Sequence, residues 1–175
     1  LFDVVDGEPV LREITGAPDD AGADSIFTGG GYDVVLGGSE SDLIDAGTDR
    51  SRDIVLGDNG QVLFDISGVL TEVRTSAPSV GGDDEILVGD GPDIVFGGTG
   101  DDLINFTVNA QGEKVPVGTA SGDDVIVGDN GFALFSAMNN RPHSVLREIE
   151  TSDPDNGGGD FIFAGDGYDV VLGGS

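Results

Sequence analysis

Aspartate recurs every nine residues along this chain, in each case ahead of a short apolar stretch. The spacing occurs in three runs: Asp24, Asp33 and Asp42; Asp84, Asp93 and Asp102; Asp160 and Asp169. An apolar residue follows each of these aspartates two positions later, and glycine-rich tetrads such as GGTG at 97–100 precede them. Carboxylates set in glycine-rich turns offer the oxygen donors that a hard cation prefers.

The nine-residue unit predicts one turn followed by one short strand. The turn needs glycine because glycine accepts positive φ without strain. Two units then form one coil of a solenoid, and successive coils stack as parallel strands over a thin core of inward apolar residues. We therefore expect an all-β fold, a parallel β-roll (β-solenoid) with interrupting loops and added β-hairpin strands.

Turns of such a roll alternate between its two edges, so aspartates from neighbouring coils should meet. The expected pairs are Asp24 with Asp42, Asp33 with Asp53, Asp84 with Asp102, and Asp93 with Asp124. Each pair, together with carbonyl oxygens of the adjoining glycine turns, can surround a cation. Calcium accepts about 6–8 oxygen ligands in flexible geometry, which fits better than magnesium's octahedron or a transition metal's need for imidazole or thiolate.

Charge limits the partners of the chain. Of 175 residues 34 are acidic and 7 are basic, which gives a formal net charge of -27, while 37% of the residues are hydrophobic. Self-repulsion opposes a compact state unless a cation neutralises the acids. Nucleic acid and anionic membranes are poor partners for this surface. Cysteine is absent, which excludes disulfides and is compatible with a secreted, calcium-braced protein, and no stretch is apolar enough to span a membrane.

A longer repeat lies over the short one. DIVLGDNG at 53–60 returns as DVIVGDNG at 124–131, and LREI at 11–14 returns at 146–149. The chain therefore holds roughly two and a half copies of a unit of about 70 residues, approximately 1–62, 63–133 and an incomplete 134–175. Because both ends fall inside a copy, we expect one continuous segment of a larger repetitive protein.

These glycines and aspartates resemble the tandem GGxGxDxUx nonapeptides of RTX (repeats-in-toxin) proteins. The resemblance implies a right-handed roll, several calcium ions in its turns, type I secretion and folding outside the cell. It carries the ligand role onto the eight paired aspartates and onto Asp160 and Asp169. The accompanying metal-binding glycines are Gly29, Gly31, Gly37, Gly89, Gly91, Gly97, Gly98, Gly100, Gly165 and Gly167.

Several segments depart from the nine-residue pattern. Interruptions at Thr48–Arg52 and Phe106–Ser121 predict loops that bulge from the roll. After each GDNG string the pattern predicts a coil without its carboxylate, with Val62 and Ala133 at the ligand position and Phe64 and Phe135 pointing inward. Residues 69–73 predict an additional strand, as part of a hairpin packed on the roll.

Other interpretations explain less. A single aspartate beside glycine is ordinary turn chemistry, so Asp58, Asp90, Asp129 and Asp166 are interpreted as surface groups or groups behind the ligands. An EF-hand is excluded because the chain lacks the glutamate that closes the EF-hand loop and the helices that flank it. The one histidine, His143, is expected in a loop. Acid pairs that recur at every turn suit a periodic scaffold rather than a glycosidase centre, so no enzymatic activity is expected.

Two functions remain open. The first is a calcium-binding structural segment of a large extracellular or cell-surface protein, such as an adhesin, surface layer or filament component, that folds on binding calcium. Its partners would be calcium, further copies of the repeat, and self-assembly or cell-surface contacts. The second is a calcium-driven folding and secretion module attached to a type I-secreted hydrolase or toxin.

Overall fold

The computed structural model describes residues 1–5, 7–18, 22–117, 121–137 and 144–174. Nearly every regular element among them is a strand, and the exception is a single short 3-10 helix, η1 (Pro154–Asn156). Within these ranges no helix has the length and apolar character needed to cross a membrane. The chain is therefore all-β, with sheets of both parallel and antiparallel kinds.

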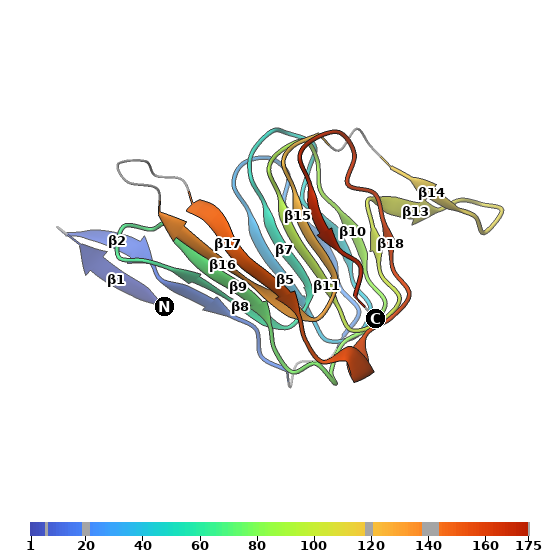
Figure 1. Cartoon of the computed structure of the whole chain (residues 1–175), viewed down its shortest axis with the longest axis horizontal. Helices are drawn as coiled ribbons and strands as arrows, with labels where there is room; N and C mark the ends of the chain where they lie inside the picture. Colours follow the sequence, from blue (N-terminus) through green and yellow to red (C-terminus); the bar gives the residue numbers. More distant parts are fainter. Residues whose placement is uncertain (6, 19–21, 118–120, 138–143, 175) are drawn as a thin grey trace.

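Two of the sheets are parallel and have five strands each (Figure 1). The outer sheet consists of β4 (Ser25–Phe27), β6 (Leu43–Asp45), β10 (Glu85–Leu87), β12 (Leu103–Ile104) and β18 (Phe161–Ile162). The middle sheet consists of β5 (Val34–Gly38), β7 (Ile54–Asp58), β11 (Ile94–Gly98), β15 (Val125–Asp129) and β19 (Val170–Leu172). Both sheets keep the same spatial order along the chain, so each outer strand has its own middle strand.

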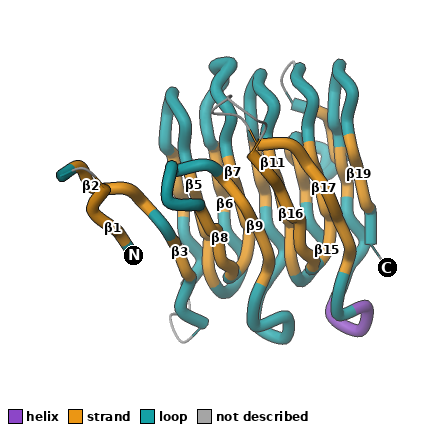
Figure 2. Tube along the Cα trace, turned by 60° about the vertical axis from the view of Figure 1, so that its left-hand side comes forward, coloured by secondary structure: helices purple, strands orange, loops and turns teal. Residues whose placement is uncertain are grey.

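The chain passes alternately between these two sheets. We call one outer strand with the middle strand that follows it a coil. Coils 1 to 5 are β4–β5, β6–β7, β10–β11, β12–β15 and β18–β19. The turns that join the strands gather at two opposite edges, as Figure 2 shows.

The outer and middle sheets enclose the core that the nine-residue pattern predicts. Seven of the apolar residues two positions after an aspartate are buried in it: Val35 is 5% exposed, and Ile44, Val55, Ile86, Val95, Ile104 and Ile126 are each 0% exposed. Side chains alternate across a strand, so one apolar residue per strand fills this narrow core.

A third layer, the antiparallel sheet, covers the other face of the middle sheet. It consists of β3 (Glu13–Thr15), β8 (Gly60–Phe64), β9 (Leu70–Thr75), β16 (Gly131–Ala137) and β17 (Ser144–Thr151), in the order β17-β16-β9-β8-β3. Its inward side chains form a second core with residues such as Leu56 and Phe96 of the middle sheet. The middle strands are buried on both faces, which explains their continuous apolar triplets IVL, IVF and VIV.

The expected coil at Val62 and Ala133 is wrong. The strand β8 pairs antiparallel with β9 and β3, and β16 pairs antiparallel with β17 and β9. Val62 and Ala133 are both 0% exposed and belong to the second core beside Phe64 and Phe135. These segments leave the two-sheet path instead of continuing it. The additional strand expected at 69–73 is present as β9.

The middle sheet and the antiparallel sheet gain strands at the same rate along the chain. Between coils 2 and 3 the chain adds β8 and β9 to the antiparallel sheet, and between coils 4 and 5 it adds β16 and β17. Two coils likewise add two strands to the middle sheet. Since neighbouring strands lie about 4.8 Å apart in any sheet, both layers grow by about 10 Å over the same stretch of chain.

Two hairpins lie outside these layers. The first joins β1 (Phe2–Val5) to β2 (Glu8–Leu11), and the second joins β13 (Phe106–Val108) to β14 (Lys114–Pro116). The second hairpin occupies most of the interruption that was expected to be a plain loop. Its Phe106 packs edge-on against Phe161, whose ring also lies 3.7 Å from Nζ of Lys114.

Candidate metal sites

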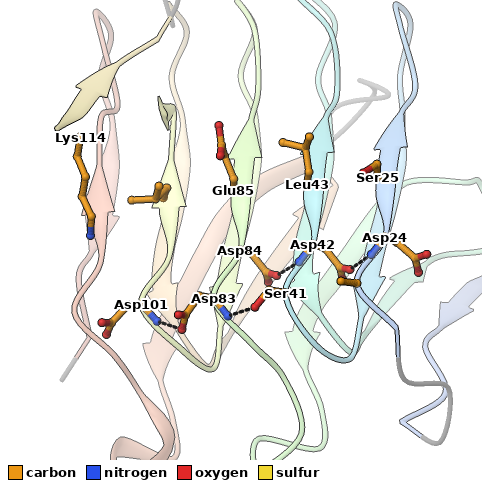
Figure 3. Close-up of a pocket in the computed structure, with 12 residues that line it drawn as sticks. Asp24, Ser25, Ser41, Asp42, Leu43, Asp83, Asp84, Glu85, Asp101 and Lys114 are labelled. Carbon is orange, nitrogen blue, oxygen red and sulfur yellow. Dashed lines mark hydrogen bonds between the residues drawn. The ribbon is translucent and has the colours of Figure 1, made fainter. Parts of the chain in front are cut away.

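One row of aspartates runs along the edge where the outer strands begin. This outer ladder contains Asp24, Asp42, Asp84, Asp102 and Asp160, each directly before an outer strand. The backbone N–H of each aspartate donates to Oδ1 of the aspartate in the next coil, at 2.7, 2.8, 2.8 and 3.0 Å in chain order. Figure 3 shows the first two of these bonds.

A second row runs along the opposite edge, where the middle strands begin. This middle ladder contains Asp33, Asp53, Asp93, Asp124 and Asp169. The same N–H to Oδ1 bonds connect its members, at 2.9, 2.8, 2.9 and 3.1 Å. The structure thus brings the ten predicted aspartates into two rows of five, one per coil on each edge, and their role as ligands stays a prediction.

The second carboxylate oxygen is the chemically notable one. In seven ladder residues Oδ2 is buried and has no hydrogen-bond partner: Asp33, Asp42, Asp84, Asp93, Asp102, Asp124 and Asp160. A buried polar atom without a partner costs free energy that folded proteins rarely leave uncompensated. Seven such oxygens at equivalent positions indicate that something other than the polypeptide satisfies them.

Main-chain carbonyl oxygens lie beside these oxygens on the outer ladder. A Cβ atom placed on Gly97 would collide with both Oδ2 of Asp102 and the carbonyl oxygen of Gly128. One placed on Gly57 would collide with Oδ2 of Asp84 and lie 2.5 Å from the carbonyl oxygen of Gly97. Glycine is therefore needed because a carboxylate and the next coil's backbone occupy the space of a side chain.

The same arrangement recurs in the other coils. A Cβ atom on Gly37 would meet Oδ2 of Asp42, and one on Gly128 would meet Oδ2 of Asp160. Gly57 and Gly128 were not among the predicted glycines. They follow an apolar triplet just as Gly37 and Gly97 do, and that shared position was the signal that would have identified them.

The other predicted glycines divide between the two edges. Near the outer ladder lie Gly98 and Gly100; near the middle ladder lie Gly29, Gly31, Gly89, Gly91, Gly165 and Gly167. Positive φ requires glycine at several of them, for example 121° at Gly31 and 148° at Gly91. At Gly167 a Cβ atom would lie 2.9 Å from Oδ1 of Asp169, so this edge also packs glycine backbone against its ladder.

Side chains alone do not complete a metal site. Among the residues that the structure describes, no three Asp, Glu, His or Cys side chains come close enough together to hold a metal ion. A cation here would have to take carboxylate oxygens and glycine carbonyl oxygens together. This all-oxygen, mixed donor set fits calcium and lacks the nitrogen and sulfur ligands that transition metals favour.

Burial makes these carboxylates costly to ionise. Desolvation raises the pKa of Asp102 to about 9, of Asp84 to about 8 and of Asp93 to about 7, and neighbouring ladder carboxylates add to the effect. Desolvation also raises the pKa of Asp53, Asp124 and Asp160 to about 6, and that of Asp42 to a lesser extent. A bound divalent cation would supply the opposite charge that these groups lack.

A groove borders part of the outer ladder. It has a volume of about 540 Å³ and runs along the free face of the outer sheet, where Asp24, Asp42 and Asp84 line it together with Lys114 (Figure 3). An exposed second row lies next to it, in which Asp101 donates its N–H to Oδ1 of Asp83 at 2.9 Å. The groove and this second row thus border the outer ladder on its solvent side.

The four aspartates that were predicted to lie at the surface or behind the ligands differ in their exposure. Asp166 is exposed and Asp90 is half-buried, but Asp58 and Asp129 are only 1% and 2% exposed, so a surface position is wrong for this pair. Tyr32 and Tyr168 lie exposed in equivalent turns. His143 lies outside the described residues.

Comparison with known families agrees with this geometry. The model of the RTX calcium-binding nonapeptide repeat matches the chain in four copies, over residues 19–52, 79–107 and 155–175. These ranges contain eight of the ten ladder aspartates, and Asp53 and Asp124 fall outside them. That family is a calcium-binding repeat and not a catalytic domain. No curated protein and no solved structure matched the chain.

Proposed function

Because this chain carries RTX calcium-binding nonapeptide repeats, we propose that both ladders bind several calcium ions and that calcium drives folding. The observation that carries the proposal is the row of buried Oδ2 atoms without hydrogen-bond partners. On the outer ladder these atoms face glycine carbonyl oxygens, the second half of a calcium coordination sphere. The ligands would be the ten ladder aspartates with the ten predicted glycines, to which Gly57 and Gly128 are added.

The architecture that accompanies this function is a parallel β-roll. Two stacked parallel sheets joined by glycine turns support it, and the family supports the right-handed sense. The chain would be one continuous segment of three copies, 1–62, 63–133 and an incomplete 134–175. The first two copies would each add two coils and the third would add one, with an antiparallel hairpin, β8–β9 or β16–β17, starting at each boundary between copies. The middle sheet and the antiparallel sheet gain the same number of strands per copy, which favours a unit that can repeat along the chain without strain.

We assign the segment a structural role in a large extracellular or cell-surface protein of the adhesin, surface-layer or filament kind. Type I secretion and folding outside the cell follow from the family's usual behaviour. Without calcium, the ladder carboxylates repel one another, and their burial costs desolvation free energy. With calcium, the free energy of binding becomes free energy of folding, because the unfolded chain has no preformed site.

Circular dichroism of the purified segment with calcium and with a chelator tests the proposal. We expect a β spectrum in millimolar calcium and loss of that spectrum in EDTA, since extracellular modules bind calcium with dissociation constants of about 10⁻⁴ to 10⁻³ M. Magnesium at the same concentration should not replace calcium. A β spectrum that EDTA leaves unchanged would contradict calcium-driven folding.

A further inference from the structure

Two equivalent Asp–Asn pairs are buried where the chain leaves the middle sheet. Asp58 and Asn59 follow the apolar triplet of β7, and Asp129 and Asn130 follow that of β15. All four side chains are at most 2% exposed. Neither aspartate belongs to a ladder, and the nine-residue pattern does not require a carboxylate at this position.

Asp58 binds the backbone of two ladder turns in other coils. Its Oδ1 accepts the N–H of Gly82 at 3.2 Å, and its Oδ2 accepts the N–H of Thr99 at 2.6 Å. Gly82 lies two residues before Asp84, and Thr99 lies three residues before Asp102. One carboxylate therefore connects the turns that present two consecutive members of the outer ladder.

Asp129 repeats this contact one long repeat later. Its Oδ1 accepts the N–H of Gly158 at 2.7 Å, and Gly158 lies two residues before Asp160. The glycine environment is repeated as well. A Cβ atom on Gly98 would collide with Oδ2 of Asp58, and one on Gly174 would collide with Oδ2 of Asp129.

The neighbouring asparagines reach in the opposite direction, to the preceding coil. Nδ2 of Asn59 donates to the carbonyl oxygen of Gly38 at 2.9 Å and to Oγ of Ser39 at 3.1 Å, in the turn before Asp42. Nδ2 of Asn130 donates to Oγ1 of Thr99 at 3.0 Å. Each Asp–Asn pair thus spans the turns of the coils on both sides of it.

The surroundings of Asp58 differ in kind from those of a ladder carboxylate. Both oxygens of Asp58 meet N–H donors, which stabilise an anion and repel a cation. A ladder carboxylate such as Asp84 keeps Oδ2 free of donors and close to carbonyl oxygens. Burial raises the pKa of Asp58 to about 7, as it does that of Asp93, so the difference between the two aspartate types lies in the hydrogen-bond partner of Oδ2.

We propose that Asp58 and Asp129 are positioning residues that hold successive calcium-binding turns at their binding distance without touching the metal. Asn59 and Asn130 extend the connection to the preceding coil. The inference rests on the proposed calcium function. It adds a connection between coils that consists of protein hydrogen bonds and not of metal ligands, through which binding at one coil orders the turns of the next.

Calcium counting separates positioning from ligation. The variants are Asp58→Asn, the ladder variant Asp84→Asn, and the control Asp65→Asn. Asp65 is a matched control because its Oδ1 also accepts two N–H groups, from Ser67 and Val69, but in a turn of the antiparallel sheet. Equilibrium dialysis gives the calcium ions bound per chain at saturation, and circular dichroism gives the calcium concentration at half-folding.

We expect D58N to bind as many ions at saturation as the unsubstituted chain, with a half-folding calcium concentration at least about five-fold higher and a shallower transition, because two charge-assisted hydrogen bonds are weakened. D84N should lose bound calcium. D65N, at a half-buried position, should keep the ion count and shift the half-folding concentration less than D58N does. If D58N cannot fold at any calcium concentration, Asn59→Ser carries the same test without altering charge. It should keep the ion count and raise the half-folding concentration.

Loss of bound calcium in D58N to the extent seen in D84N would make Asp58 a ligand and overturn the proposal. A half-folding concentration unchanged in both D58N and N59S would overturn it as well. The proposed function fails separately, if the unsubstituted chain binds no calcium.

Discussion

The backbone N–H of Asp84 donates to Oδ1 of Asp102 at 2.8 Å, while Oδ2 of Asp102 is buried without a hydrogen-bond partner. One oxygen of the carboxylate fixes the register between two coils. The other faces the carbonyl oxygen of Gly128 across the space that Gly97 leaves open. The same side chain thus sets the spacing of the coils and offers an oxygen to a cation.

Substitution of Asp102 by asparagine separates these two tasks. The amide oxygen can still accept the N–H of Asp84, but the amide hydrogens and the lost charge exclude a cation. We expect Asp102→Asn to bind at least one calcium ion fewer per chain and to need several-fold more calcium to fold. Isothermal titration calorimetry measures the ion count, with Asp155→Asn at an exposed position as the control. An unchanged ion count would remove Asp102 from the ligands.

Addition of one methyl group at Gly97 should close the site. Gly97 does not have positive φ, so alanine meets no backbone strain there, but its Cβ atom would collide with Asp102 and Gly128. Overpacking of this kind costs about 1–3 kcal/mol of folding free energy. Urea unfolding in calcium should show that loss for Gly97→Ala. Gly22→Ala, whose Cβ atom would meet nothing within 4 Å, should unfold like the unsubstituted chain.

The calcium-free chain should be more stable in acid than in alkali. Burial raises the pKa of Asp93, Asp84 and Asp102 to about 7, 8 and 9, whereas an unfolded aspartate titrates near 4. The folded state therefore binds more protons, and its stability falls as pH rises from about 4 to about 9. Circular dichroism of calcium-depleted protein at pH 5, 7 and 9 measures this, and we expect the largest β signal at pH 5. A larger β signal at pH 9 than at pH 5 would contradict the cost of burying ionised ladder carboxylates.

The fold and the ladders were largely predictable because the spacing of aspartates records the geometry of parallel coils. In a parallel sheet with constant turn length, residues at equivalent positions must lie side by side, so Asp84 and Asp102 had to meet. The sequence also indicates that the middle strands are buried on two faces, because it contains the continuous apolar triplets IVF at Ile94–Phe96 and VIV at Val125–Val127. Local pattern and three-dimensional arrangement carry the same information there.

The rest depended on partners that are distant in sequence. Alternating apolar residues in GQVLF at 60–64 suit a parallel coil and an antiparallel strand equally, and only pairing with β9 decides between them. The role of Asp58 was hidden for a similar reason. Its side chain is identical to a ligand's, and only the N–H groups of Gly82 and Thr99 distinguish it.

A carboxylate introduced at position 62 tests the antiparallel sheet directly. The nine-residue pattern places Val62 at a ligand position, so Val62→Asp should restore a calcium site if this segment were a coil. In the structure Val62 is 0% exposed and packs in the second core, without the glycine carbonyls of a turn around it. We therefore expect Val62→Asp to cost several kcal/mol, on the order of the penalty for an unpaired buried charge, and to bind no additional calcium. Urea unfolding and calorimetry measure the two quantities, with Val62→Ala accounting for the lost packing. An additional bound ion with stability retained would favour the coil over the antiparallel strand.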